Sequence, residues 1–510
     1  MKLNNKKTIY VGFAFFLICL FWQSYDSLIP KILVDKFGMN QTLSGFIMAL
    51  DNIFALFMLP LFGTLSDKTK SKYGKRTPYI LIGTILAAVF YLCLSFVDGW
   101  QKNNIADVDI DNPNALATLY DADLEFKMPD DSRTYKLKEK LSREEFLSIE
   151  MYDKDGNINP DYTNYVVPVR QSYAWKTTKA NPATLVTFIA LLLLVLISMS
   201  TFRSPAVALM PDVTIKPLRS KANAIINLLG TSGGILVLVM GIIFKTGKAE
   251  NALMSYIPYF SVVICIMLVS LLIFKLNVNE PKFVEEMKAE SKLYGIEEDA
   301  EEENNSHKLS KEERKSLYLI LASVILWFFG YNAVTSKYSV YAGNVLNVDF
   351  NTTLLIGNAA AIVSYIPVGM VSSKLGRKKV ILGGVVILAI SFFAASFLRA
   401  GTPAMIMNLL FALAGIGWAS INVNSFPMVV ELASGSDIGK YTGFYYTASM
   451  AAQTLTPIIS GVFLDIRYTT LFPYATIFVV AAFFTMLATK HGDSKPDAKT
   501  IMENISEMGD

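Results

Sequence analysis

Apolar segments long enough to cross a lipid bilayer recur along almost the whole chain of 510 residues. A membrane-spanning helix needs about 20 mainly apolar residues, because the hydrocarbon layer is about 30 Å thick. Within lipid, every backbone polar group needs an internal partner, so spans of this length form helices. The sequence therefore predicts an all-α membrane protein.

We expect twelve such helices, arranged as two pseudo-symmetric six-helix bundles. Composition agrees, since 53% of the residues are hydrophobic and only 17% are charged, which is more apolar than a soluble domain requires. The spans predicted in the first half are residues 8–34, 43–65, 78–97, 185–211, 222–244 and 257–276. Those predicted in the second half are residues 317–341, 354–373, 380–398, 405–430, 443–464 and 471–487.

Two long polar segments interrupt the spans. One lies between the third and fourth helices, and the other joins the two halves. Within the first, the spacing Ser142-Arg-Glu-Glu145 is that of a capping box and predicts a short helix. The predicted domains are a first bundle at 1–276, an insert at 98–181, a linker at 277–315, a second bundle at 316–490 and a tail at 491–510.

Short basic loops predict the orientation in the membrane. Three such loops, between helices 2 and 3, 4 and 5, and 8 and 9, all fall on one side. The positive-inside rule makes that side cytoplasmic, so we expect both termini inside and the insert outside the cell, in the plasma membrane. The net charge of +3 belongs to these loops and does not indicate nucleic acid.

The basic loop after the second helix has a weaker copy in the second half. One constant offset pairs Gly63 with Gly369 and Ser66 with Ser372, and a shorter offset pairs Asp212 with Glu431. The chain is therefore predicted to be an internal duplication. Membrane proteins built from such repeats are usually carriers.

Two carboxylates are predicted deep inside the first two helices. Asp26 lies well into the first helix and Asp51 early in the second, which runs the opposite way, so both reach a similar depth. A charge at mid-span costs roughly 3 kcal/mol and needs a partner, water or a function. We expect these two residues to couple protons to transport, and the alternative is that one of them only lines a watery vestibule.

Arg203 is predicted inward of the middle of the fourth helix, too far from Asp26 for a direct ion pair. We expect a partner such as Asp212, a backbone carbonyl or a substrate hydroxyl. Structural pairing and substrate contact both stay open for this residue.

Aromatic and amide side chains gather on the first, seventh, tenth and eleventh helices. Sugars stack their C–H faces on aromatic rings while amides bind their hydroxyls, so this lining favours a neutral polyol. The alternative is ordinary helix packing or an interfacial belt. The substrate-binding candidates, besides Arg203, are Trp22, Gln23, Tyr25, Trp327, Tyr331, Asn332, Trp418, Asn422, Asn424, Tyr445 and Gln453.

Signals for enzyme chemistry are missing from the sequence. It contains no metal-ligand cluster, phosphate-binding loop or nucleophile elbow, so we expect no metal, no cofactor and no enzyme. The three cysteines fall within predicted spans, and the two histidines lie outside them. Proton movement would therefore depend on carboxylates.

The loop Gly63-Thr-Leu-Ser-Asp67 followed by Gly74-Lys-Arg76 resembles the loop signature of the major facilitator superfamily. Its longer form, residues 66–80, is similar to that of the glycoside/pentoside/hexuronide cation symporters. The segments 422–431 and 439–446 resemble the sucrose-carrier branch. The resemblance implies sugar uptake, of a disaccharide or glycoside, by alternating access driven by a cation gradient.

The resemblance also implies a cytoplasmic gate formed by Asp67 and the cations after it. The gating candidates are Gly63, Asp67, Gly74, Lys75, Arg76, Gly369 and Arg377. In the second repeat Ser373 replaces the Asp, which predicts two unequal gates. We expect a monomer that binds only its sugar, its coupling cation and the lipid bilayer.

One departure from the family bears on the coupling ion. Melibiose-type carriers bind sodium through Asp-x-x-Asn-Asp before the proline of the second helix, whereas this chain has residues 55–59, Ala-Leu-Phe-Met-Leu, before Pro60. We therefore favour protons. The alternatives are an uncoupled facilitator or exporter, or a lipid or amphiphile carrier of the same fold.

Overall fold

The computed structural model describes residues 3–154, 156–294, 310–432 and 438–493. Among these residues, twelve helices are long and apolar enough to cross a membrane, which confirms the predicted number. The first six are α1 (Asn5–Asp35), α2 (Gln41–Lys68), α3 (Thr77–Asn104), α8 (Ala183–Asp212), α9 (Arg219–Ile243) and α10 (Ile257–Asn277). The second six are α12 (Lys311–Tyr341), α13 (Phe350–Leu375), α14 (Arg377–Ala395), α15 (Ala404–Val430), α16 (Ile438–Ile466) and α17 (Leu471–Leu487).

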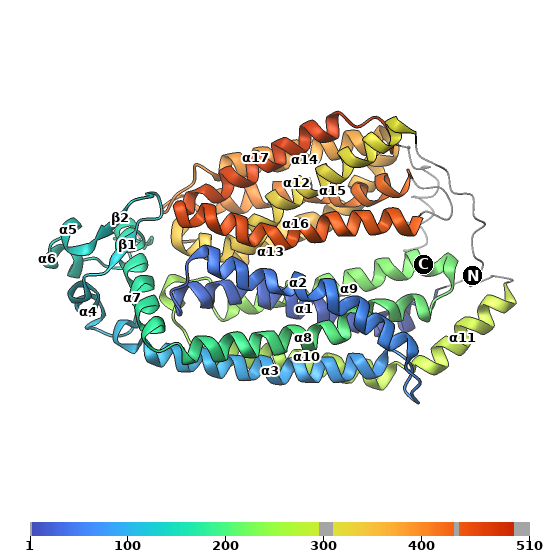
Figure 1. Ribbon diagram of the computed structural model, residues 1–510, viewed down its shortest axis with the longest axis horizontal. Helices are drawn as coiled ribbons and strands as arrows, with labels where there is room; N and C mark the ends of the chain where they lie inside the picture. The colour runs from blue at the N-terminus through green and yellow to red at the C-terminus, as the bar shows by residue number, and fades with distance from the viewer. Residues whose placement is uncertain (1–2, 155, 295–309, 433–437, 494–510) are drawn as a thin grey trace.

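The two sets of six helices form two bundles that lie side by side (Figure 1). The bundles meet through three helix pairs, α2 against α16, α9 against α13 and α1 against α12. Glycines allow close approach at the first pair, since a Cβ at Gly45 would lie 2.0 Å from the Pro457 carbonyl oxygen. A Cβ at Gly461 would likewise lie 2.4 Å from the Gln41 carbonyl oxygen. Only glycine therefore fits at these two contacts.

The insert folds over one end of the bundles, at the left of Figure 1, and we call this end the insert side. It has its own apolar core, which includes Leu119, Phe126 and Phe146. The predicted capping box is confirmed, because Ser142 accepts from the Glu145 backbone N–H while Glu145 accepts from that of Ser142. Its elements are α4 (Ala115–Ala122), β1 (Glu125–Lys127), β2 (Thr134–Lys136), α5 (Leu137–Lys140), α6 (Arg143–Leu147), the π-helix η2 (Tyr162–Val166) and α7 (Val167–Ala180).

Helix α3 runs beyond the predicted end of its span, as far as Asn104. The reason is a buried ion pair, in which Lys36 Nζ lies 2.6 Å from an Asp98 carboxylate oxygen with both side chains fully buried. Lys36 also donates to the Met254 carbonyl at 2.7 Å and lies 4.5 Å from the centre of the Tyr256 ring. Asp98 is thus a packed residue of the bundle end and not part of the polar insert.

The segment between the halves contains helix α11 (Glu280–Leu293), at the end of the bundles opposite the insert. We call this end the linker side. Lys7, near the start of α1, forms an ion pair with Glu286 of α11, with its Nζ 3.2 Å from the carboxylate. Residues 295–309, within the predicted linker, and residues 494–510, most of the predicted tail, lie outside the described residues.

Candidate functional site

A cavity of about 100 Å³ lies between the two bundles, inside the membrane-spanning part of the protein. Both predicted coupling carboxylates, Asp26 and Asp51, line it from the first bundle. Two predicted substrate-binding residues, Asn332 and Gln453, line it from the second bundle. The structure thus brings together four candidate residues from four different helices.

Asp26 is exposed to solvent although it lies deep within α1. Asp51 is half-buried, and one of its carboxylate oxygens accepts a hydrogen bond from the Asn52 side chain at 2.8 Å. Across the cavity, the Asn332 amide nitrogen is buried without a protein hydrogen-bond partner. The cavity therefore offers two carboxylates and a free amide donor to a polar molecule.

Three polar residues on the cavity wall, Asn52, Thr335 and Ser336, were not among the sequence candidates, and neither were the apolar Met48 and Pro457. The two hydroxyls bond to backbone carbonyls of their own helix, at 3.3 Å for Thr335 and 3.4 Å for Ser336. The sequence could have indicated Thr335 and Ser336 only through their position, one helical turn after the candidate Asn332.

Arg203 reaches towards the first helix and not towards Asp212. Its guanidinium carbon lies 5.3 Å from the centre of the Trp22 ring, within the range of a cation–π interaction. Asp212, the partner expected for Arg203, instead accepts from Arg76 Nε at 2.8 Å. Among the described residues no carboxylate forms an ion pair with Arg203, so it can bind an external partner.

Several aromatic candidates pack within the bundles. Tyr331 and Trp418 stack with their ring centres 3.8 Å apart. Trp327 and Tyr25 are fully buried, and the Tyr445 hydroxyl bonds to Ser425 at 2.9 Å. These residues do not line the cavity, so their contact with a substrate stays a prediction.

The remaining amide candidates are spread over three environments. Gln23 donates to Ser27 on its own helix at 3.1 Å, and Asn424 is buried and donates to the Ser420 carbonyl at 2.9 Å. Asn422 is exposed. Their part in substrate binding also stays a prediction.

Hydrogen bonds that join the two halves gather on the insert side. The Asp465 carboxylate, near the end of α16, accepts from the backbone N–H groups of Gln41 at 2.6 Å and Thr42 at 2.8 Å. The fully buried Lys337 donates to the Gln41 carbonyl at 2.8 Å. We call Gln41, Thr42, Lys337 and Asp465 the clasp.

The insert adds further contacts to the second half. Its Pro129 carbonyl accepts from the Tyr468 backbone N–H at 3.0 Å, and its Asp130 pairs with Arg399 at 3.0 Å. On the linker side, by contrast, Phe57 of α2 and Tyr446 of α16 are exposed, at 68% and 54%. The hydrogen bonds and the ion pair between the halves therefore close the insert side.

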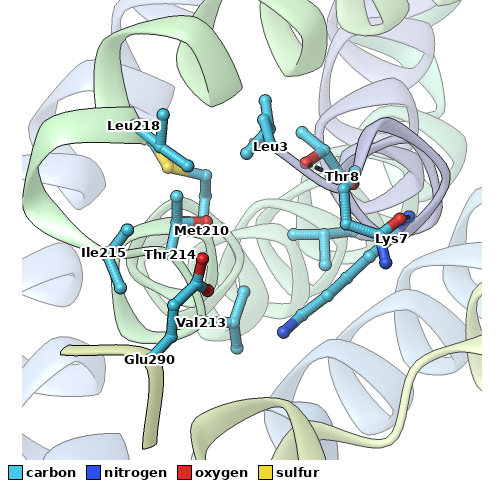
Figure 2. Close-up of a pocket in the computed structure, with 11 residues that line it drawn as sticks. Leu3, Lys7, Thr8, Met210, Val213, Thr214, Ile215, Leu218 and Glu290 are labelled. Carbon is cyan, nitrogen blue, oxygen red and sulfur yellow. Dashed lines mark hydrogen bonds between the residues drawn. The ribbon is translucent and has the colours of Figure 1, made fainter. Parts of the chain in front are cut away.

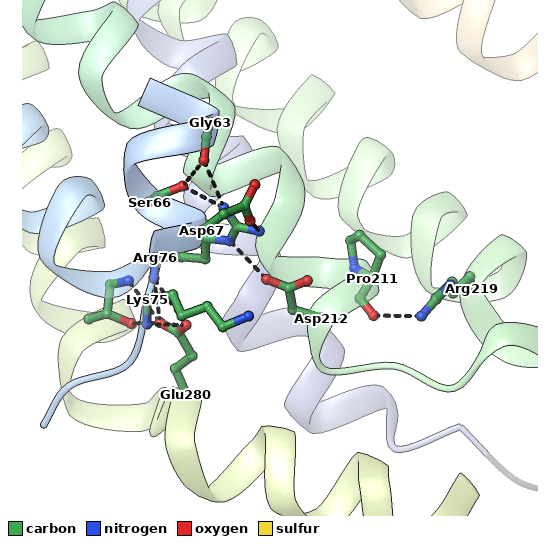
Figure 3. A network of polar contacts seen from close by, with 10 residues as sticks. Gly63, Ser66, Asp67, Lys75, Arg76, Pro211, Asp212, Arg219 and Glu280 are labelled. Carbon is green, nitrogen blue, oxygen red and sulfur yellow. Dashed lines mark hydrogen bonds and ion pairs between the residues drawn. The ribbon is translucent and has the colours of Figure 1, made fainter. Parts of the chain in front are cut away.

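The loop after α2 forms a compact polar network (Figure 3). Arg76 donates to Asp67 at 2.5 Å, to Asp212 at 2.8 Å and to the Gly63 carbonyl at 3.4 Å. The pseudo-symmetric loop has a smaller version, in which Arg377 pairs with Glu431 at 3.1 Å. These contacts lie within each half, so a role in holding the halves together stays a prediction.

Glu280, the first residue of α11, is a member of this network that sequence reasoning placed in the linker. Its buried carboxylate accepts backbone N–H bonds from Lys75 at 2.7 Å, Arg76 at 3.0 Å and Thr77 at 2.8 Å. These are free N–H groups at the start of α3, where a negative charge is stabilising. Gly74 has a φ of +101° and packs closely against Glu280. A Cβ added at Gly74 would lie 2.2 Å from the Glu280 carboxyl carbon.

A smaller pocket of about 60 Å³ lies on the linker side between the start of α1, the end of α8 and α11 (Figure 2). Its lining mixes apolar side chains, such as Met210 and Leu218, with polar ones, such as Lys7 and Glu290. From Val11, which also lines it, to Asp26 the helix rises about 22 Å. It is therefore separate from the cavity of the two aspartates.

Two curated proteins are similar to short parts of the chain. The uncharacterized symporter sll1374 of Synechocystis is 39% identical over 59 residues, which are 12% of this chain and 11% of that protein. Sucrose transport protein SUC3 of Arabidopsis thaliana is 33% identical over 63 residues, again 12% and 11% of the two chains. The aligned region thus spans only about a tenth of either relative.

The whole fold is similar to a solved transporter structure. The inward open conformation of the xylose transporter XylE from E. coli aligns with a TM-score of 0.57 and 15% identity, covering 98% of each chain. This likeness shows the fold, which is that of a multi-pass membrane transporter. Since the MFS_1 like family pattern matches residues 17–475, nearly all of both bundles, the chain belongs to the major facilitator superfamily of transporters.

Proposed function

We propose that this transporter takes up a disaccharide or glycoside together with protons by alternating access. The observation that carries the proposal is the cavity between the bundles, with Asp26 and Asp51 on one wall and Asn332 and Gln453 on the other. Carboxylates inside a membrane mark proton or ion pathways. Amides suit the hydroxyls of a neutral sugar.

The named relatives add support from a different direction. One is called a symporter and another a sucrose transport protein, and both matches are short. The absence of the sodium pattern before Pro60 favours protons over sodium. In transporters built from repeats the substrate site usually lies at the interface between the repeats, and this cavity has that position.

The proposal includes an orientation and a location. The basic residues Lys72, Lys75 and Lys374 lie on the linker side, which the positive-inside rule makes cytoplasmic. The protein is then a monomer in the cell membrane with its insert outside. In this orientation the clasp closes the extracellular side, as expected of the state from which an importer releases its substrate to the cytoplasm.

Transport by purified protein in proteoliposomes tests the proposal. Uptake of radiolabelled sucrose and maltose is measured with and without an inward-acid gradient, and the gradient should drive accumulation above equilibrium. Asp26→Asn should abolish accumulation and spare sugar exchange, while Asp111→Asn, at an exposed insert position, should behave as the parent. Equal uptake with and without the gradient would indicate an uncoupled facilitator. No uptake across a panel of disaccharides would count against a sugar substrate.

A further inference from the structure

A small cavity of about 40 Å³ lies on the insert side, where the insert and both halves meet. Arg170 lines it from α7 of the insert, and Lys31 and Asp35 line it from α1. Asn344 lines it from the π-helix η5 (Ala342–Leu346), which directly follows α12. Lys248 lines it from the loop after α9, and Tyr162, Gln171 and Asn347 add further polar groups.

Arg170 is a buried cation without a matching anion. Only 6% of the residue is exposed, and its Nη1 donates to the Tyr162 hydroxyl at 3.0 Å. Its Nε–H has no acceptor, and no carboxylate among the described residues forms an ion pair with it. A buried unpaired charge is strongly destabilising, so this guanidinium needs a counter-ion.

Asn344 provides a second unused donor on the same cavity. It is 5% exposed, and its amide oxygen accepts from Gln171 at 3.2 Å. Its amide nitrogen is buried with no acceptor at hydrogen-bond distance, and the Tyr468 hydroxyl is a polar neighbour outside the cavity lining. Two buried donors, one on the insert and one on the second half, therefore line one cavity and lack an acceptor.

The other charged groups leave the cavity positive. Lys31 pairs with Asp35 at 2.7 Å, and the second oxygen of Asp35 accepts from Gln171 at 3.1 Å. The Asp35 charge is thus balanced by Lys31. Arg170 and the exposed Lys248 are the remaining charged side chains of the lining, and both are cations.

We propose that this cavity binds a small inorganic anion, chloride. A water needs about 10–15 Å³, so the cavity holds one monatomic ion or a few waters and excludes a sugar. Water alone would leave the Arg170 charge uncompensated, whereas an anion accepts from both unused donors. The ion lies between the insert and the second half, so it favours the state in which the insert side is closed.

The test compares chloride with gluconate, which is too bulky for the cavity, at constant ionic strength. Thermal unfolding of the purified protein is followed as chloride replaces gluconate, and Tm should rise and saturate as expected for a ligand of the folded state. Arg170→Gln should weaken the apparent chloride affinity about tenfold or more, since a charged hydrogen bond is lost. Lys176→Gln, an exposed position on the same helix α7, should leave the affinity unchanged.

A second variant keeps the test decisive if Arg170→Gln does not fold. Lys248→Gln removes an exposed charge and should weaken chloride binding about two- to fivefold without unfolding the protein. Equal Tm values in chloride and gluconate would overturn the proposal, as would an unchanged chloride response in Arg170→Gln. Because the readout is stability in the absence of sugar, its failure is distinguishable from failure of the sugar-transport proposal.

Discussion

Asp465 in the second half caps the start of α2 in the first half, with its carboxylate 2.6 Å from the backbone nitrogen of Gln41. Side-chain oxygens at a helix start satisfy N–H groups that lack a partner within the helix, and usually they come from the same chain segment. Here the capping group comes from the other bundle. Opening of the insert side must therefore break this cap.

Removing the charge of Asp465 should shift the protein towards the state that is open on the insert side. Asp465→Asn loses charged hydrogen bonds to Gln41 and Thr42, each worth about 1.5–3 kcal/mol. The measurement is alkylation of a Ser336→Cys reporter on the cavity wall by a membrane-impermeant maleimide added on the insert side. We expect labelling about tenfold faster or more.

The control for this measurement is Asp111→Asn, which removes an exposed carboxylate of the insert. Its labelling rate should match that of the parent carrying the same reporter. An unchanged rate in Asp465→Asn would show that the clasp does not hold the insert side closed.

Loss of the Glu280 carboxylate should destabilise the linker side of the first bundle. Glu280→Gln leaves N–H groups of Lys75, Arg76 and Thr77 without their charged acceptor, a cost of about 2 kcal/mol. A lower Tm of the purified protein is the expected readout. Glu285→Gln, an exposed position on the same helix α11, should leave Tm unchanged; equal Tm values for the two variants would contradict the capping role.

Two of the gating candidates, Gly74 and Gly369, should respond differently to alanine. Gly74 has a φ of +101° and its added Cβ would clash with Glu280, so Gly74→Ala should lower both Tm and yield. Gly369 lies in a helix with no atom within 4 Å of an added Cβ, so Gly369→Ala should keep or raise Tm. A similar loss in both variants would refute the steric account.

The contact between the insert and Arg399 should contribute little on its own. Arg399 and Asp130 are 42% and 53% exposed, and pairs of this kind are worth about 0–1 kcal/mol. We expect Arg399→Gln to change reporter labelling at Ser336→Cys by less than about fivefold. Labelling as fast as in Asp465→Asn would mean that the insert contributes as much to closure as the clasp.

The twelve helices could be predicted from sequence because each buries its backbone in lipid and needs a continuous apolar run. The depth of Asp26 and Asp51 was also predictable, since it follows from helix rise and direction alone. The length of α3 was not, because its last turns are polar in sequence. Asp98 becomes acceptable in a buried helix end only through its ion pair with Lys36.

The roles of residues whose partners lie in another part of the fold could not be predicted from the sequence. Lys337 and Asp465 stand near span ends, where charges are ordinary, and only the arrangement of the two bundles makes them a clasp. Glu280 looks like a linker residue until α3 is placed beside it. The sequence suggested Asp212 as a possible partner of Arg203, but in the folded protein Asp212 pairs with Arg76.

The central claim, movement of protons together with sugar through the cavity of Asp26 and Asp51, is tested most directly by the pH of the external solution. Sucrose or maltose is added to lightly buffered proteoliposomes that carry the protein, with no imposed gradient. The account predicts transient alkalinisation outside as protons enter with the sugar, and no such signal in Asp26→Asn. Sugar entry at an unchanged external pH in the parent protein would contradict it.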